Sequence, residues 1–477
     1  MSLLNEQNRK WWTLGTVTFS LFMVMLDTTI VNVALPAIQA DLSLEISDLE
    51  WIVNGFLLTY AVFLLTGGKL ADFLGRRRIF LTGFFVFVAS SLACGLAVNG
   101  SMLIAARAAQ GVGAALMLPG TLSIISATFS VRERGTAFGI WAGVSGLGLA
   151  LGPLVGGLLT EGIGWRWIFF VNVPLGAIGL VAGRLIIRES RDTSEEQRLD
   201  VAGLVASGAA LFLLTFALVE GNGYGWGSPV ILMCFAGSAA AFAAFLLLEH
   251  RQRLPMLDLA LFRNPTFAGA SLVALTLTLA LLGVLFFVSI YLQTILGYSA
   301  VRAGLAFMPM TLLFMALAPP TGKIADRIGP RWPIATGMTL LAVALFLMSR
   351  LGADSSFWEQ LPALLLAGAG LGMTLPPVNA AALGSVPVAK AGVAAGVLNT
   401  CRQTGGSLGV AIMGAILLVR IGDRTASDPG FAEAFMAGFE NALRVAAIIV
   451  LAGAVTAALA IRRLRERGAS QAFEAGL

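Results

Sequence analysis

A single ionisable side chain, Asp27, lies in the first apolar stretch of the sequence, residues 12–35. A carboxylate at membrane depth is costly and usually faces a protein interior or a water-filled cavity. Its chemistry there is exchange of a proton or binding of a cation, because burial favours the neutral acid and a nearby cation favours the carboxylate. The alternative is a structural carboxylate that an arginine neutralises.

Other polar side chains in apolar stretches are candidates for a substrate site. The guanidinium of Arg402 could contact substrate or be satisfied by backbone carbonyls near Gly405 and Gly406, and the sequence leaves both open. The uncharged candidates could line a cavity or form hydrogen bonds between helices. The predicted substrate-binding set is Asn32, Asn54, Tyr60, Gln110, Asn379, Asn399 and Arg402.

The composition places almost all of the chain in a membrane. Of 477 residues, 57% are hydrophobic and 12% are charged, and the mean hydropathy is +0.86. No soluble catalytic domain fits, and the net charge of +5 more plausibly reflects membrane orientation than a nucleic-acid partner. Three separated cysteines and one histidine give no metal pattern and no disulfide framework. We expect no metal, no cofactor other than a proton gradient, and no enzymatic activity.

Hydrophobic runs about twenty residues long predict an all-α membrane protein with fourteen transmembrane helices. The first run is too long for a signal peptide and is read as a retained helix. Ser47 and Glu50 are spaced as a capping box at the start of the second. The predicted spans are 12–35, 49–67, 79–98, 102–129, 136–159, 167–187, 201–219, 230–248, 266–292, 303–318, 334–348, 361–383, 393–418 and 442–461.

Basic residues predict the orientation of these spans. If the N-terminus is cytoplasmic, five of the 31 Lys and Arg fall in outside loops and three lie within spans, which leaves 23 in inside segments. Such an excess marks cytoplasmic loops, so both termini are predicted to be cytoplasmic. The outside loop 421–441 mixes acidic and aromatic residues, and could form an interfacial helix or hairpin, or a solvated linker.

Two halves of the chain are repeated. The loop GKLADFLGRRR at Gly68 returns as GKIADRIGPRW at Gly322, with six of eleven positions identical at an offset of 254, and the fourth span matches a later one at an offset of 257. Both repeats begin on the same side of the membrane, an arrangement that lets two bundles rock about a site between them. The predicted domains are an N-terminal six-helix bundle (1–188), a linker with two inserted transmembrane helices (189–264) and a C-terminal six-helix bundle (265–477).

Depth makes Arg107 the natural partner of Asp27. Asp27 lies nine residues before Pro36 on an outward span, and Arg107 lies near the start of an inward one. At about 1.5 Å per residue, both are roughly 9 to 14 Å below the same outer surface, although equal depth does not establish adjacency. At the repeat offsets their counterparts are Leu281 and Leu364. We therefore predict that proton coupling by Asp27 and Arg107 is concentrated in the N-terminal half.

The repeated loop contains residues suited to a gate. Gly68 and Gly75 would permit tight turns, and Asp72 could accept hydrogen bonds from a helix N-terminus or from Arg76. A contact that forms in one rocked state and breaks in the other would act as a latch. The alternative is an ordinary positive-inside signal, which suits the arginines better than the aspartate. The counterparts in the second copy are Gly322 and Asp326.

The fifth span carries a stripe of glycines. Gly148, Gly152 and Gly156 are spaced at i, i+4 and i+8, which gives a smooth groove on one helical face. Such a groove allows close helix packing in lipid, and Pro153 within it permits a bend. Packing alone would explain the pattern.

Several motifs together resemble a known family. GKLADFLGRRR and its second copy resemble the loop signature of the major facilitator superfamily. LDTTIVNVALPAI, RAAQGVGAA, GLALGPLVGG and WRWIFFVNVPLG resemble its fourteen-helix drug/proton antiporter family, over essentially the whole chain. The resemblance implies efflux of amphipathic, often cationic compounds in exchange for protons, and it implies that the glycine stripe marks exporters.

We therefore expect a proton-coupled antiporter that exports hydrophobic or cationic drugs by alternating access in a bacterial cytoplasmic membrane. Its expected partners are amphipathic or cationic small molecules, protons and membrane lipids, without nucleic acid, and the expected state is a monomer. One alternative is a dedicated exporter of one endogenous metabolite, antibiotic or lipid. Another is a membrane sensor that binds ligand without transport. The sequence alone does not separate them.

Overall fold

The computed structural model describes residues 6–191, 200–252, 257–387, 390–422, 424 and 428–462. Over these residues the chain is helical with short connections, and fourteen helical segments are long and apolar enough to cross a membrane, as predicted. Three crossings consist of two elements each: α6 with α7, α10 with η3, and α11 with α12. The elements are α1 (Glu6–Leu42), α2 (Ile46–Leu74), α3 (Arg76–Gly95), α4 (Gly100–Thr128), α5 (Val131–Gly162), α6 (Trp167–Phe170), α7 (Asn172–Ile186), α8 (Val201–Tyr224), α9 (Pro229–Arg251), η2 (Leu259–Arg263), α10 (Pro265–Ile290), η3 (Tyr291–Ile295), α11 (Ala300–Ala306), α12 (Met308–Ile328), α13 (Arg331–Met348), α14 (Phe357–Gly384), α15 (Ala391–Ile421) and α16 (Phe431–Ala460).

Local sequence explains several helix ends, but the predicted capping box of α2 is wrong. Asn99 caps α4 by accepting a hydrogen bond from the Met102 amide at 2.8 Å. At α2 the capping box is Glu45 with Asp48, whose carboxylate accepts from the Glu45 amide at 3.1 Å. The helix begins earlier than the apolar run suggested, so Glu50 is a buried interior residue instead of a cap.

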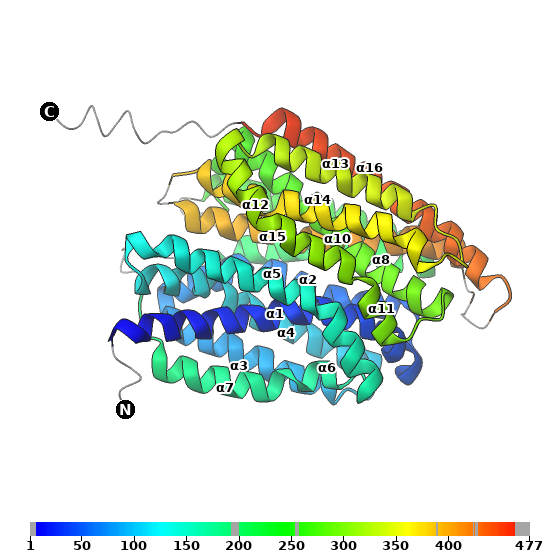
Figure 1. Ribbon diagram of the computed structural model, residues 1–477, viewed down its shortest axis with the longest axis horizontal. Helices are drawn as coiled ribbons and strands as arrows, with labels where there is room; N and C mark the ends of the chain where they lie inside the picture. The colour runs from blue at the N-terminus through cyan, green and yellow to red at the C-terminus, as the bar shows by residue number, and fades with distance from the viewer. Residues whose placement is uncertain are drawn as a thin grey trace.

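The helices form two groups with the same internal packing (Figure 1). In the first, α1 packs on α5 while α4 packs on α2 and α3. In the second, α10 packs on α15 while α14 packs on α12 and α13. These pairs are related by the sequence repeat, and we call the groups the N half (α1 to α7) and the C half (α10 to α16). The domain boundaries at 188 and 264 stay predictions, and residues 192–199 of the linker lie outside the described part.

One of the inserted helices, α8, lies over a seam between the two halves. α8 packs against α9 and also against α2 of the N half and α15 of the C half. The indole of Trp51 on α2 donates to Glu220 on α8 at 2.8 Å, and Asn222 on α8 donates to the Ala415 carbonyl on α15 at 3.0 Å. α8 therefore bridges the seam that α2 and α15 form.

The halves pack together along α2 and α15, and they also meet at one end of the bundle. We call the end where α1 begins and α16 ends the terminal end, and the opposite one the far end (Figure 1). At the far end, the amide of Val301 on α11 donates to Glu161 on α5 at 2.9 Å, and Gln293 donates to the Val33 carbonyl at 2.9 Å. Toward the terminal end of α5, nothing lies within 4 Å of a methyl group built on Gly139 or Gly143. The two halves are thus joined at the far end through α5 and α11, whereas α5 is uncovered at Gly139 and Gly143 toward the terminal end.

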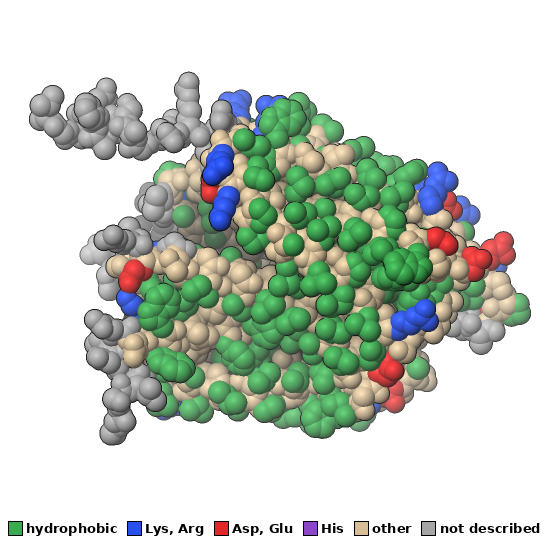
Figure 2. Space-filling model, viewed as in Figure 1, with side chains coloured by type: hydrophobic (Ala, Val, Ile, Leu, Met, Phe, Trp, Pro, Cys, Tyr) green, Lys and Arg blue, Asp and Glu red, His purple; other side chains and the backbone are tan. Residues whose placement is uncertain are grey.

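The surface has the distribution expected of a membrane protein. Figure 2 shows apolar side chains along the flank of the bundle, with charged side chains gathered at its two ends. Exposed apolar residues such as Leu459, Ile448 and Ile178 are two-thirds or more accessible without a bilayer. Lipid contact satisfies such a surface.

The predicted start of the last span at residue 442 is wrong, because the helix already covers the second half of the outside loop 421–441. α16 begins at Phe431, so the aromatic residues form the first turns of the last crossing. Phe431, Phe435 and Phe439 are buried, and the Phe439 ring stacks on Tyr291 with centroids 5.1 Å apart. Burial of these rings outweighs the one acidic residue between them, Glu433, which is exposed. Residues 423 and 425–427 of this loop lie outside the described part.

Candidate functional site

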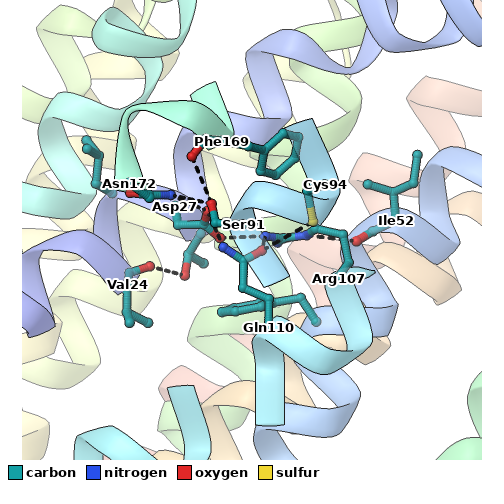
Figure 3. Close-up of polar contacts among 12 residues, drawn as sticks. Val24, Asp27, Ile52, Ser91, Cys94, Arg107, Gln110, Phe169 and Asn172 are labelled. Atoms are coloured by element: carbon teal, nitrogen blue, oxygen red, sulfur yellow. Dashed lines mark hydrogen bonds and ion pairs between the residues drawn. The ribbon is translucent and has the colours of Figure 1, made fainter. Parts of the chain in front are cut away.

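Asp27 and Arg107 form a buried ion pair between α1 and α4 (Figure 3). Arg107 Nη1 lies 2.5 Å from Asp27 Oδ2, and the two side chains are 2% and 0% exposed. The agreement in depth therefore reflects real adjacency. Because breaking a buried pair by removing one partner costs about 3–5 kcal/mol, each residue constrains the other strongly.

Two amides complete the environment of the carboxylate (Figure 3). Gln110 Nε2 donates to Asp27 Oδ1 at 2.9 Å, and its own oxygen accepts from Arg107 at 2.7 Å. Asn172 Nδ2 donates to the same Asp27 oxygen at 3.2 Å and to Ser91 Oγ at 3.0 Å. Gln110, predicted to contact substrate, is thus placed in the charged network. Asn172 was missed, although a polar residue inside the apolar run FFVNVP was its available signal.

Arg107 is held from its other side by the backbone and by aromatic rings. Its Nε donates to the Ile52 carbonyl on α2 at 3.3 Å. The guanidinium carbon lies 4.4 Å from the Phe56 ring centroid and 5.9 Å from that of Phe169, distances at which a cation is attracted to a ring face. These contacts hold the Arg107 guanidinium in place independently of Asp27. Among the described contacts, Arg107 is the one charged partner of the Asp27 carboxylate. Protonation of Asp27 would therefore leave Arg107 in place and remove the ion pair.

The glycine stripe of α5 holds the helix that carries Asp27. A methyl group at Gly148 would lie 2.9 Å from Met25 Cβ, one at Gly152 would lie 1.8 Å from Thr29 Oγ1, and one at Gly156 would lie 2.6 Å from the Ile30 carbonyl oxygen. α1 therefore lies directly in the predicted groove, as the packing explanation requires.

At the terminal end, a hydrogen bond from the Lys10 ammonium on α1 holds the pKa of the Glu133 carboxyl below its ordinary value.

Pro153 connects this groove to both neighbours of α5. Proline lacks an amide hydrogen, so the carbonyl of Leu149 loses its helical donor, and Thr29 Oγ1 on α1 approaches that oxygen at 3.4 Å. The carbonyl oxygen of Pro153 itself lies 2.4 Å from a methyl group built on Gly304 of the C half. α5 is therefore packed closely between the Asp27 helix and α11.

A second polar cluster surrounds Arg402 of the C half. Arg402 Nη2 donates to Asn379 Oδ1 at 2.5 Å, and Nη1 lies 3.4 Å from Asn399 Oδ1. Side-chain amides, in place of the backbone carbonyls near Gly405 and Gly406, thus bind the two terminal nitrogens of the guanidinium, while Nε is buried without a hydrogen-bond partner. Tyr60 of the N half bonds to Gln403, the next residue along α15. Four of the predicted substrate residues, Tyr60, Asn379, Asn399 and Arg402, thus meet where the halves face each other.

The two remaining candidates lie away from this cluster. Asn32 is 3% exposed, and its amide donates to the Thr28 carbonyl at 3.1 Å on its own helix. Asn54 is fully buried in α2, and neither of its side-chain polar atoms has a hydrogen-bond partner. An apolar cavity of about 30 Å³ lies between the halves, and it is lined by residues that include Thr29, Met310 and Phe314. At about 10–15 Å³ for each water, it has room for about two water molecules.

The predicted tight turn of the gating loop is present at Gly75 but not at Gly68, and the second copy of the loop behaves in the same way. Gly75 has φ +116° and its repeat counterpart Gly329 has φ +93°, a conformation that favours glycine. Gly68 and Gly322 make no turn, because α2 and α12 continue through them. Asp72 pairs with Arg76 at 2.9 Å, and Glu189 accepts from the Arg77 amide at the start of α3 at 3.0 Å.

Comparison with known proteins fixes the family. The sequence profile described as Major Facilitator Superfamily matches residues 17–410. The chain belongs to the major facilitator superfamily. It is a multi-pass membrane transporter and not an enzyme, which agrees with the expectation from composition.

Several bacterial relatives are named as resistance or export proteins. The tetracenomycin C resistance and export protein of Streptomyces glaucescens is 38% identical over 417 residues, which are 87% of this chain and 78% of the relative. The multidrug resistance protein Stp of Mycobacterium tuberculosis is 36% identical over 85% of this chain and 75% of its own length. The methylenomycin A resistance protein of Bacillus subtilis is 36% identical over 83% of this chain and 85% of its own.

Solved structures of transporters share the fold. A bacterial homologue of the human lysosomal transporter Spinster, described as inward-facing and unoccupied, superposes with a TM-score of 0.67 at 18% identity, covering 96% of this chain and 98% of its own. An auto-inhibited peptide transporter of the POT family gives a TM-score of 0.69 at 16% identity, over 97% and 99%. These similarities support the fold alone.

Proposed function

We propose that this transporter is a proton-coupled antiporter that exports amphipathic or cationic compounds from the bacterial cytoplasm as a monomer. The observation that carries the proposal is the buried pair of Asp27 and Arg107, whose carboxylate can exchange a proton without leaving the protein interior. The corresponding positions of the C half are Leu281 and Leu364, so the carboxylate–guanidinium pair has no counterpart there. The resistance and export functions in the relatives' names support the direction of transport.

Coupling would follow from competition at Asp27. A proton on Asp27 or a cationic substrate beside it would neutralise the carboxylate in place of Arg107. Each ligand would stabilise the two rocked states to a different extent. α5 packs closely on both the Asp27 helix and the C half, so a shift of α1 would be transmitted across the interface. The cluster around Arg402 and Tyr60 would contact the polar part of the substrate.

Transport into inverted membrane vesicles tests this function. With an acidic interior, vesicles that contain the protein should accumulate fluorescent cationic dyes, and a protonophore should release them. A membrane sensor would bind the dyes without accumulation. A panel that includes polycyclic antibiotics separates broad efflux from export of a single compound, the alternative that names such as tetracenomycin C export protein favour.

The orientation gives a first prediction. Reporters fused after Leu477 and inserted near Ser427 should report the cytoplasm and the exterior respectively, because inside loops carry most of the basic residues. Alkaline phosphatase and green fluorescent protein fusions measure this. Two reporters on the same side would contradict either the helix number or the orientation.

The loop gives a second prediction. Asp72→Asn should leave insertion and folding unchanged but slow dye transport several-fold, because the Asp72–Arg76 contact would lose its charge in the state shown. Glu359→Gln, which removes an exposed carboxylate at the far end, is the matched control. Unchanged turnover of Asp72→Asn at equal expression would reduce the loop to a topology signal.

A further inference from the structure

Glu50 is a buried acid that the mechanism above does not use. It lies on α2 near the far end and is 0% exposed, and neither carboxyl oxygen has a hydrogen-bond partner. A methyl group on Gly414 of α15 would lie 1.9 Å from one of these oxygens. The carboxyl group is therefore pressed directly onto the backbone of the C half, in a space that only glycine leaves free.

The seam around Glu50 supplies no compensating positive charge within the described residues. α8 covers this seam, and its carboxylate Glu220 is the charged group that acts electrostatically on Glu50. On α15 the side chain of Ser407 is also buried and unpartnered, as is Asn54 one turn further along α2. A charged carboxylate without donors or a cation would cost several kcal/mol in such a place.

We propose that Glu50 is a proton-binding site at the far-end seam, and that the seam between α2 and α15 closes only when Glu50 carries a proton. The proposal rests on alternating access between the halves, as proposed above, but not on Asp27. Opening of the seam would expose Glu50 to water on the far side, where it ionises. Closing would require a proton from that same side.

The direction of the effect follows from this linkage. A high external pH removes the proton and favours the open seam, and a low external pH favours the closed seam seen here. One coupled proton changes the ratio of open to closed molecules by up to about tenfold per pH unit. The proton gradient would then act twice, once at Asp27 and once by resetting the transporter from the outside.

Labelling of a cysteine in the seam tests the proposal. Ala411 on α15 is fully buried three residues before Gly414, so Ala411→Cys reports opening when Cys94, Cys234 and Cys401 are replaced by alanine. A membrane-impermeant maleimide is added to whole cells at external pH 5.5 to 8.5, with correction for the reagent's own pH dependence from a surface cysteine. The rate should rise by up to about tenfold per pH unit over part of this range.

Two substitutions should move the labelling in opposite directions. Glu50→Gln keeps the shape of the neutral acid but cannot ionise, so labelling should be slow and independent of pH. Gly414→Ala inserts a methyl group against the carboxyl, so labelling should be fast at every pH. Gly392→Ala, on the same helix with nothing within 4 Å, is the matched control and should behave as the parent protein.

Further variants identify the responsible acid. Glu220→Gln should keep the pH dependence of labelling. If this variant loses the pH dependence while Glu50→Gln retains it, the assignment to Glu50 is overturned. Asp27→Asn should also keep it even where dye accumulation is abolished, which separates failure of this proposal from failure of proton coupling at Asp27. A Glu50→Gln protein whose labelling follows pH as in the parent would refute the proposal.

Discussion

Asp27→Asn should abolish proton-driven accumulation of cationic dyes in inverted vesicles, down to the level of vesicles without the protein. Asparagine keeps the shape of the side chain and can still accept a hydrogen bond from Arg107, but it cannot exchange a proton. The ion pair that ties α1 to α4 is then permanently absent, so a proton no longer distinguishes the two rocked states. Dye accumulation is followed by fluorescence, with protein quantity measured by immunoblot.

Asp41→Asn is the matched control for this substitution. Asp41 lies on the same helix and pairs with Arg166 at 2.6 Å, but both side chains are more than one-third exposed. A surface pair of this kind contributes about 0–1 kcal/mol, so transport should persist. Binding of neutral compounds to Asp27→Asn should also persist. If Asp27→Asn still concentrates dye against a gradient, the coupling proton must bind elsewhere, with Glu50 as the first candidate and Glu161, Glu220 and Asp326 after it.

Arg107→Ala serves as the companion variant in the same assay. It leaves the Asp27 carboxyl with the neutral donors Gln110 and Asn172. The rate should fall, and the pH optimum should move toward alkaline values, because the cation that favours release of the proton is gone. An unchanged pH profile with a lower rate would assign Arg107 a purely structural role.

The sequence predicts this pair because both depth and charge are readable along a helix. An apolar run fixes where a span lies, the rise per residue fixes the depth of Asp27 and Arg107, and a buried charge has few possible partners. The repeat then places the pair in one half. The same repeat predicts two bundles, and the packing of α1 on α5 parallels that of α10 on α15.

The residues that sequence analysis missed are those whose role depends on lateral packing. Asn172 contacts Asp27 because α6 and α7 meet at a short irregularity that brings it toward α1. Glu50 was read as a helix cap because its spacing from Ser47 fits one, whereas its true neighbour is Gly414, distant by more than 360 positions. Local patterns contain no information about which face of α2 meets α15.

The prediction of where α16 begins is wrong for a related reason. The mixture of acidic and aromatic residues in 421–441 is compatible with an interfacial segment or a linker, yet the helix buries Phe439 against Tyr291 and leaves Glu433 exposed. An amphipathic helix and an interfacial segment have the same periodicity. Only the presence of an aromatic partner from the C half decides between them.

Gly152→Ala should reduce both transport and stability because it forces α1 away from α5. The new methyl group would lie 1.8 Å from Thr29 Oγ1 and 2.7 Å from Thr29 Cβ, atoms next to the backbone that cannot rotate away freely. Overpacking of this kind costs about 1–3 kcal/mol. Asp27 precedes Thr29 by two positions on the same helix, so displacement of Thr29 also displaces Asp27. The dye transport rate should therefore fall at least about tenfold, the equivalent of about 1.4 kcal/mol.

Gly143→Ala on the same helix is the matched control, since nothing lies within 4 Å of its methyl group. It should transport normally and should melt no earlier than the parent protein, because alanine is the better helix former. In the double variant Gly152→Ala with Thr29→Gly, the small residue stands on α1 in place of α5. This variant should recover part of the transport that Gly152→Ala loses, and Thr29→Gly alone is the control for the second substitution. Melting of the purified protein in detergent and dye uptake into vesicles measure the two effects. If Gly152→Ala matches Gly143→Ala in both assays, close approach of α1 to α5 is not needed to position Asp27.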